Sequence, residues 1–228
     1  METRIYVIMT GVVLLAVCST VQAVNKDFYS SGQILPGESW DIVNIYNDDT
    51  VVDMLGGSAD YISTFDASSL NVVDGYAQVG AFDYSSINIS GGILSGAEAS
   101  NYATVDFNGD ATSAFLGASQ FGVANMTGGT LDRISAVDSG IVNLFAGNVL
   151  ERLWASDSSV INIYGYDLMK SDSGGTYGYG VVTGFLTDDT YISVDLSNPE
   201  AYEHINLIPE PCTLALVAMG LLLLRRKR

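Results

Sequence analysis

Polar and apolar residues alternate in short runs along the middle of the chain, and the runs recur at a regular spacing. In each run a single polar residue, usually asparagine, stands between two residues that are mostly aliphatic, which is the alternation of a β-strand with one buried face. Seven such triplets are present: Val43-Asn44-Ile45, Leu70-Asn71-Val72, Ile87-Asn88-Ile89, Val105-Asp106-Phe107, Ala124-Asn125-Met126, Val142-Asn143-Leu144 and Ile161-Asn162-Ile163. The gaps between their central residues are 27, 17, 18, 19, 18 and 19, which indicates a repeat of 17–19 residues.

A second polar column supports the same register. It lies five residues before the triplet centres, at Asp66, Asp83, Asn101, Gln120, Asp138 and Asp157. The residues before this column also alternate, so Ile134 with Ala136 and Leu153 with Ala155 are expected to face inward. Glycine recurs three or four residues after the triplet centres, where a corner of the chain needs positive φ. Each repeat therefore contains two or three short strands joined by corners.

These features predict an all-β fold: a single-stranded parallel β-helix, or β-solenoid, of six to seven coils, with a right-handed coil favoured. Coils stacked at roughly 4.8 Å complete one another's backbone hydrogen bonds and bury a continuous core. Residues 24–165 form this body, and residues 166–208, where the period is lost, are predicted to form an antiparallel β cap with strands at 181–185, 191–196 and 201–208. The long first gap predicts a longer loop or an N-terminal cap at residues 47–59.

Equivalent residues of a solenoid lie directly above one another, so the asparagine column is expected to form a ladder of side-chain amides. Its members are Asn71, Asn88, Asn125, Asn143 and Asn162, with Asn44 as a first member and Asp106 as an interruption. The column is either a flat polar surface for sugar hydroxyls or a device that stabilises the stack. We favour the second interpretation, because amide ladders stabilise stacked sheets without any ligand.

The charge balance excludes several classes of function. The chain has 9 basic and 26 acidic residues, and the stretch from Val24 to Ile208 has only 4 basic against 24 acidic residues, a net charge of −20. Such a body lacks the basic surface that nucleic acid requires. Its two cysteines, Cys18 and Cys212, lie in the apolar termini, and His204 is its single histidine, so thiol nucleophiles and multi-histidine metal sites are excluded from the body.

No cofactor is expected. Calcium needs six to eight oxygen ligands, and the densest acidic clusters are Asp48-Asp49 with Asp53, and Asp188-Asp189. A structural calcium ion is therefore possible there, but solvated acidic turns are the favoured interpretation.

One pair of arginines is a candidate ligand face. Asp132-Arg133 and Glu151-Arg152 occupy equivalent positions 19 residues apart, so Arg133 and Arg152 should lie on neighbouring coils, each beside a carboxylate. They could form a small cationic site for an acidic sugar, or a catalytic arginine with acidic partners, as on the β-helices of polysaccharide lyases and hydrolases. The favoured alternative is an Arg–carboxylate network between coils.

The N-terminus has the pattern of a secretory signal peptide at residues 1–23. Arg4 supplies a positive start, an apolar run follows, and Val21-Gln22-Ala23 predicts cleavage after Ala23. Export through the Sec machinery is therefore expected. A retained anchor is disfavoured because the apolar run is shorter than the roughly 20 residues that span a bilayer, and a lipoprotein signal is disfavoured because the bulky Val17 precedes Cys18.

The C-terminus has three parts in order. Pro209-Glu210-Pro211 precedes an apolar run at residues 213–224, expected to be helical like the apolar N-terminal run, and the chain ends with the basic cluster Arg225, Arg226, Lys227 and Arg228. This arrangement resembles the PEP-CTERM sorting signal of exopolysaccharide-producing bacteria. The resemblance implies transient insertion into the inner membrane, cleavage at Pro209-Glu210-Pro211 by an exosortase, and delivery to the cell surface or extracellular matrix. A plain tail anchor is the alternative.

The expected function is that of a non-catalytic surface or matrix protein, structural or adhesive, that is processed by an exosortase and associated with exopolysaccharide. The alternative is a β-helix that binds or degrades polysaccharide through the Arg133 and Arg152 face. The regular repeat, the sorting tail and the shortage of catalytic residue types favour the first.

Overall fold

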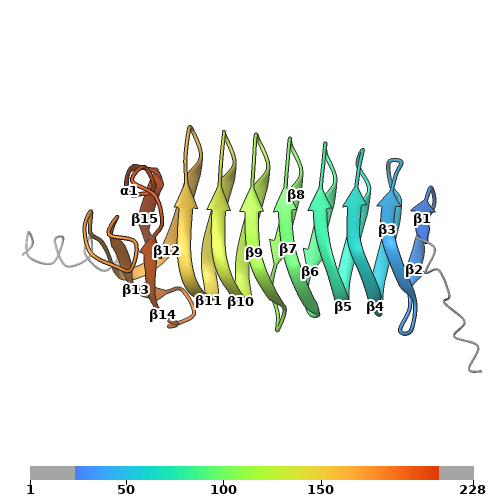
Figure 1. The fold of residues 1–228 in the computed structure, drawn as a ribbon, viewed down its shortest axis with the longest axis horizontal. Coiled ribbons are helices and arrows are strands. Elements are labelled where there is room, and N and C mark those ends of the chain that lie inside the picture. The colour runs from blue at the N-terminus through green and yellow to red at the C-terminus, as the bar shows by residue number, and fades with distance from the viewer. Residues whose placement is uncertain (1–23, 211–228) are drawn as a thin grey trace, which may run out of the picture.

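A computed structural model describes residues 24–210, which form a long rod of stacked strands (Figure 1). The strands are β1 (Asn25–Phe28), β2 (Gly32–Ile34), β3 (Ser39–Ile45), β4 (Val51–Thr64), β5 (Ser69–Ala81), β6 (Ser86–Ile89), β7 (Ile93–Ala99), β8 (Thr104–Phe107), β9 (Thr112–Ala118), β10 (Val123–Ala136), β11 (Ile141–Ala155), β12 (Val160–Lys170), β13 (Val181–Leu186), β14 (Tyr191–Leu196) and β15 (Ile205–Pro209). One short helix, α1 (Ala201–His204), interrupts the described strands.

The rod is a parallel β-solenoid of about eight turns, which confirms the predicted all-β solenoid. The predicted count of six to seven coils was too low. The predicted apolar helices at the two termini lie outside the described residues, and the hand of the coil stays a prediction.

Each turn contributes two strand segments, and each segment pairs with its equivalent in the next turn. The first segment carries the asparagine column, and β6 aligns Asn88 with Asn71 of β5 and with Asp106 of β8. The second segment follows after a bend, which lies inside the long strands β4, β5, β10 and β11 as a shift of register. The bend needs glycine in β5, where Gly75 has φ of 116° and a Cβ would lie 2.8 Å from the carbonyl oxygen of Gly57.

The corner that closes each turn is built by the second polar column. Asp66, Asp83, Asn101, Gln120, Asp138 and Asp157 all adopt positive φ, between 54° and 62°. Aspartate and asparagine tolerate this left-handed conformation better than most residues with a Cβ. The turn is closed by hydrogen bonds such as that from the Ser85 amide to the Phe82 carbonyl (3.1 Å), so this column has a structural task in every turn.

The core is a set of parallel aliphatic columns inside the coil. The residues that flank the asparagines are buried, as Leu70 and Val72 illustrate, and the asparagines face outward. Ile134 with Ala136 and Leu153 with Ala155 are also buried, as predicted. The strand alternation read from the sequence is thereby confirmed.

The sequence-based register was wrong in the first turns. Asn44 aligns with Ser63 of β4 and not with the asparagine column, whose member at this level is Asp53. Residues 47–59 are not a loop or cap, because β4 begins at Val51 and continues the stack. The gap of 27 arose because the Val52-Asp53-Met54 triplet was overlooked and a triplet from the second strand segment was counted in its place.

The C-terminal part differs from a simple antiparallel cap. β13 pairs antiparallel with β12 and β14, as expected. However, β14 also pairs parallel with β11, and β15 pairs parallel with β12, so the chain resumes the solenoid after an inserted hairpin. Residues 201–204 form α1, not the predicted strand.

The N-terminal end of the rod exposes a strand edge. Among the described residues β1 pairs only with β3, so its other edge carries unpaired backbone groups. Lys26 aligns with the buried Val43 and therefore occupies the inner column, where its Nζ lies 5.2 Å from the ring centroid of Phe28 and 5.0 Å from that of Trp40. An inward-pointing charge on an edge strand opposes pairing with another chain, because docking would bury the ammonium group.

We predict that Lys26→Leu promotes end-to-end association of the rods, because an apolar inner column would then reach the open edge. Light scattering on the full chain in detergent should give a dimer or larger species for this variant at a concentration where the wild type is monomeric. Lys26→Arg keeps the charge and should behave as the wild type. An unchanged mass for Lys26→Leu would contradict the protective role of Lys26.

Candidate functional site

The asparagine column forms a hydrogen-bonded ladder along part of the rod. The Nδ2 of Asn143 donates to Oδ1 of Asn125 (2.8 Å), Asn162 donates to Asn143 (2.9 Å), and Asn206 of β15 donates to Asn162 (3.1 Å). The ladder thus crosses the inserted hairpin and joins residues 44 positions apart. Asn206 was not among the predicted members, because the lost period hid it.

Aspartates take part in the same column as acceptors. Asn71 donates to Oδ1 of Asp53 (2.8 Å), and Asn125 donates to Oδ1 of Asp106 (2.8 Å). Asn88 departs from the pattern, since its Oδ1 accepts from the side chain of Asn108 (2.8 Å), which lies at the bend. Most of these amides therefore have partners within the rod, which reduces what they can offer to a sugar.

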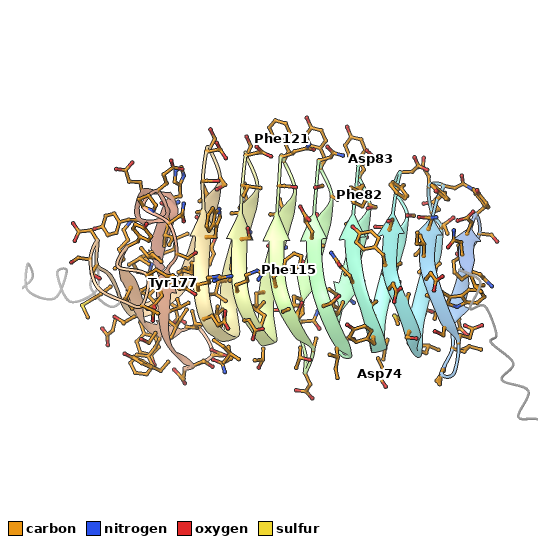
Figure 2. The ribbon with its side chains drawn as sticks, viewed as in Figure 1. Asp74, Phe82, Asp83, Phe115, Phe121 and Tyr177 are labelled. Atoms are coloured by element: carbon orange, nitrogen blue, oxygen red, sulfur yellow. The ribbon has the colours of Figure 1, made fainter. Side chains whose placement is uncertain are left out.

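Arg133 and Arg152 lie side by side, in register on β10 and β11. The Arg133 guanidinium carbon lies 5.1 Å from the ring centroid of Phe115, and that of Arg152 lies 5.6 Å from the ring centroid of Tyr177. Arg152 also donates through Nη1 to the Tyr177 hydroxyl (2.9 Å). We name Phe115, Arg133, Arg152 and Tyr177 the arginine strip; Figure 2 labels Phe115 and Tyr177 along one face of the rod.

The favoured Arg–carboxylate network is not formed. Between residues 24 and 210 neither guanidinium has an ion pair with a carboxylate, and both contact aromatic rings. Glu151 is exposed and Asp132 is half-buried, and a shift of register between Leu131 and Arg133 takes Asp132 out of the regular pairing. The two acidic residues are thus neighbours of the arginines along the chain without being their partners.

Two shallow hollows flank the arginine strip. One, of about 140 Å³, is lined by Glu98, Phe115, Gly117, Arg133 and Ser135 among others. The other, of about 430 Å³, is lined mainly by polar groups from Glu151, Thr176, Tyr177, Ser193 and Asp195. The strip therefore borders two separate open hollows, and no deep cleft encloses it.

Carboxylates in the acidic clusters accept hydrogen bonds from backbone amides. Burial alone would raise the pKa of the Asp188 carboxyl, but it accepts from the amides of Thr190 and Gly147, and these bonds hold its pKa below the ordinary value. Asp188 therefore stabilises the fold above its unfolded pKa, and this contribution is lost as pH falls through the folded pKa. Asp48 accepts from the Ala67 amide (3.3 Å). Within residues 24–210 no three acidic, histidine or cysteine side chains converge on a point where a metal ion would lie.

The other basic groups near the C-terminal end are also structural. Lys170 donates to the carbonyls of Tyr202 (2.7 Å) and Ile205 (2.8 Å). Burial lowers the pKa of its ammonium group, and the nearby Glu203 carboxylate opposes this without cancelling it. His204 Nδ1 lies 2.9 Å from the carbonyl oxygen of Ser159, so the single histidine of the chain contacts the backbone of the previous turn.

Two aromatic ladders along the rod were not predicted from the sequence. Tyr29, Tyr46, Phe65 and Phe82 stack with centroid distances of 5.2–5.4 Å, and so do Tyr84, Tyr102 and Phe121 at the next corner position. Their spacing of 17–19 residues is the repeat itself and was the available signal. Each inner ring has a neighbouring ring on both faces, so its faces are less available for stacking on a sugar than those of the end rings Tyr84 and Phe121, which are 70% and 56% exposed. Figure 2 shows Phe82 and Phe121 towards one long edge of the rod, with Asp74 at the opposite edge.

The predicted processing sites lie at or beyond the limits of the described residues. Pro209 ends β15, the amide of Glu210 donates to the Gly165 carbonyl (3.1 Å), and both residues are at the rod surface. Ala23, Pro211 and the basic cluster Arg225, Arg226, Lys227 and Arg228 fall outside the description. Within residues 24–210 no helix has the length and apolar character needed to cross a membrane.

Comparison of the chain with family models, with curated proteins and with solved structures gave no match.

We predict that Asn143→Ala lowers the free energy of unfolding by about 1–3 kcal/mol, because it removes two side-chain hydrogen bonds from a half-buried site. Asn148→Ala, at an exposed position of the same strand, is the matched control and should change it by no more than about 0.5 kcal/mol. Urea unfolding followed by circular dichroism measures both. Equal midpoints for the two variants would show that the ladder does not stabilise the stack.

Proposed function

We propose that the chain is a non-catalytic structural protein of the cell surface or extracellular matrix, in which an acidic β-solenoid rod acts as a spacer. One observation carries this proposal: the polar side chains that a catalytic site would need are engaged in contacts within the rod. Asparagine amides bind one another, the corner aspartates hold positive φ, and the arginines cover aromatic rings.

The destination is part of the same proposal. Export through the Sec machinery would end with cleavage after Ala23, which lies before β1 begins at Asn25 and would leave the strands of the rod intact. Pro209 is the last residue of β15 and Glu210 follows it, so an exosortase acting at Pro209-Glu210-Pro211 would release or transfer the rod with its other strands untouched. Transient insertion in the inner membrane through the apolar tail would precede this step.

The second candidate is a β-helix that binds or degrades polysaccharide. The observation in its favour is the arginine strip, whose guanidiniums have no carboxylate partner and lie between two hollows. Degradation would require an acid or base beside the scissile bond. The carboxylates nearest the strip are Glu98, which accepts from the Ser119 hydroxyl (3.0 Å), and Asp195, which accepts from the Thr176 amide (2.6 Å), so both already have partners within the rod. Binding alone is compatible with the structural role.

We predict that the full chain does not depolymerise acidic or neutral polysaccharides, as measured by reducing-end release and by the appearance of unsaturated products. Product release that Arg133→Gln abolishes would refute the non-catalytic role.

We also predict that the mature protein, isolated from an exporting host and examined by mass spectrometry, begins at Val24 and ends at Pro209-Glu210-Pro211. Replacing this motif by three alanines should leave the C-terminal tail attached and the protein in the membrane fraction. An intact tail on the exported wild type would refute the processing.

A further inference from the structure

The arginine strip is the one part of the rod surface where positive charge accumulates. The stretch from Val24 to Ile208 has four basic residues. Lys26 lies at the N-terminal end, and Lys170 is bonded to backbone carbonyls near the C-terminal end. The other two, Arg133 and Arg152, lie on adjacent strands of the same face. In a stretch with a net charge of −20, two neighbouring guanidiniums without carboxylate partners form a local site for an anion.

The outward side chains of the arginine strip and their neighbours form a line along the rod axis, which we call the track. The Phe115 ring lies flat on β7, so closely that a Cβ on Gly96 would meet it, and Gly117 leaves the next position on β9 open. Along the rod axis the outward column runs from Phe115, whose ring lies against Gly96, through Arg133 and Arg152 to Asp195. The loop at residues 171–180 reaches one end of the track, where Tyr177 contacts Arg152 and the Thr176 amide donates to Asp195. The hollow at the other end is lined by residues of β7, β9 and β10 and by Val137. The track is therefore long and shallow, and its geometry suits a polymer that lies along the rod and not a small molecule held in a cavity.

The groups beside the track indicate a ligand rich in hydroxyls. Glu98, Glu151 and Asp195 line the hollows, and carboxylates accept hydrogen bonds without donating any. Trp154 and Tyr177 are 42% and 40% exposed, and their flat apolar surfaces suit the C–H face of a sugar ring. A strand of nucleic acid would meet the same carboxylates with phosphates, which repel them, and has few hydroxyls to donate.

We infer that the arginine strip binds an acidic polysaccharide whose carboxylates pair with Arg133 and Arg152 while its hydroxyls donate to the flanking Glu98, Glu151 and Asp195. The inference deepens the proposed function, on which it rests, by naming the matrix component that the rod contacts. The planar fork of each guanidinium matches a carboxylate with two parallel hydrogen bonds, and the stacked rings beneath hold the forks in place.

The test is calorimetric titration of the full chain in detergent with polygalacturonate, with its methyl-esterified form, with neutral dextran and with a single-stranded DNA oligonucleotide. Polygalacturonate should bind at least about tenfold more tightly than the esterified polymer, which has the same backbone without the charge. Dextran and the oligonucleotide should bind no better than the esterified polymer. DNA binding as tight as that of polygalacturonate would overturn the inference in favour of general recognition of polyanions.

Variants locate the site. Arg133→Gln with Arg152→Gln should weaken polygalacturonate binding at least about tenfold, and the corresponding double lysine variant, which keeps charge but loses the fork, should fall between. Lys26→Gln removes one charge from the end of the rod and is the control that should bind as the wild type. Each variant is checked by far-ultraviolet circular dichroism for the strand signal. Equal binding by the double glutamine variant and the wild type would sink the inference, and such a result would leave the spacer role and the processing test unaffected.

Discussion

The parallel hydrogen bonds between successive turns determine the rest of this structure. They hold each residue directly against its equivalents in the turns before and after, at the strand spacing of roughly 4.8 Å. A side chain is therefore selected for what it does next to a similar side chain, and not only for its own environment. Aliphatic columns satisfy this condition inside the coil, and amide and aromatic columns satisfy it outside, because both groups bind their own kind.

Charged side chains fit this stacked arrangement least well, because like charges on neighbouring turns repel each other. Two unit charges of the same sign at the strand spacing repel by about 1 kcal/mol even in water, so a column of aspartates on one strand would destabilise the stack. The rod avoids such a column in its strands by alternating donors with acceptors, as in the contact of Asn125 with Asp106. The acidic residues gather instead at corners, where Asp83 and Asp138 have positive φ and face solvent. Arg133 and Arg152, which do stack, lie over aromatic rings.

Whether a feature of this fold could be predicted from the sequence depends on whether the residues that form it are related by the repeat. The fold class, the inward aliphatic pairs and the adjacency of Arg133 and Arg152 follow from periodicity, because a repeat of constant length places equivalent residues together. The register of the first turns did not follow, since Val52-Asp53-Met54 and Val43-Asn44-Ile45 fit the same alternation and only their pairing distinguishes them. Asn206 and the inserted hairpin were missed because nothing in the local pattern shows that the solenoid resumes. Tyr177, the partner of Arg152, was missed because it lies in a loop outside the repeat. Phe115, the partner of Arg133, lies within the repeat 18 residues before that arginine, so the period itself was the signal for it.

The two ends of the rod each have an exposed strand edge, and the chain protects the two edges differently. A solenoid has an open strand edge at each end, and the inner column there would be exposed to water or to another chain. At the N-terminal end the stem of Lys26 covers the column while its ammonium group lies over Phe28 and Trp40, so burial of this edge would desolvate a charge. At the C-terminal end two strands cover β12: β13 pairs with its later part, from Gly165 to Lys170, and β15 pairs with its earlier part. Within residues 24–210 β15 itself pairs only with β12, and Lys170 binds the carbonyls of Tyr202 and Ile205 beside it. Both devices are made by residues of the rod itself, so neither needs a partner to be in place, which suits the proposed role as a spacer in a crowded matrix.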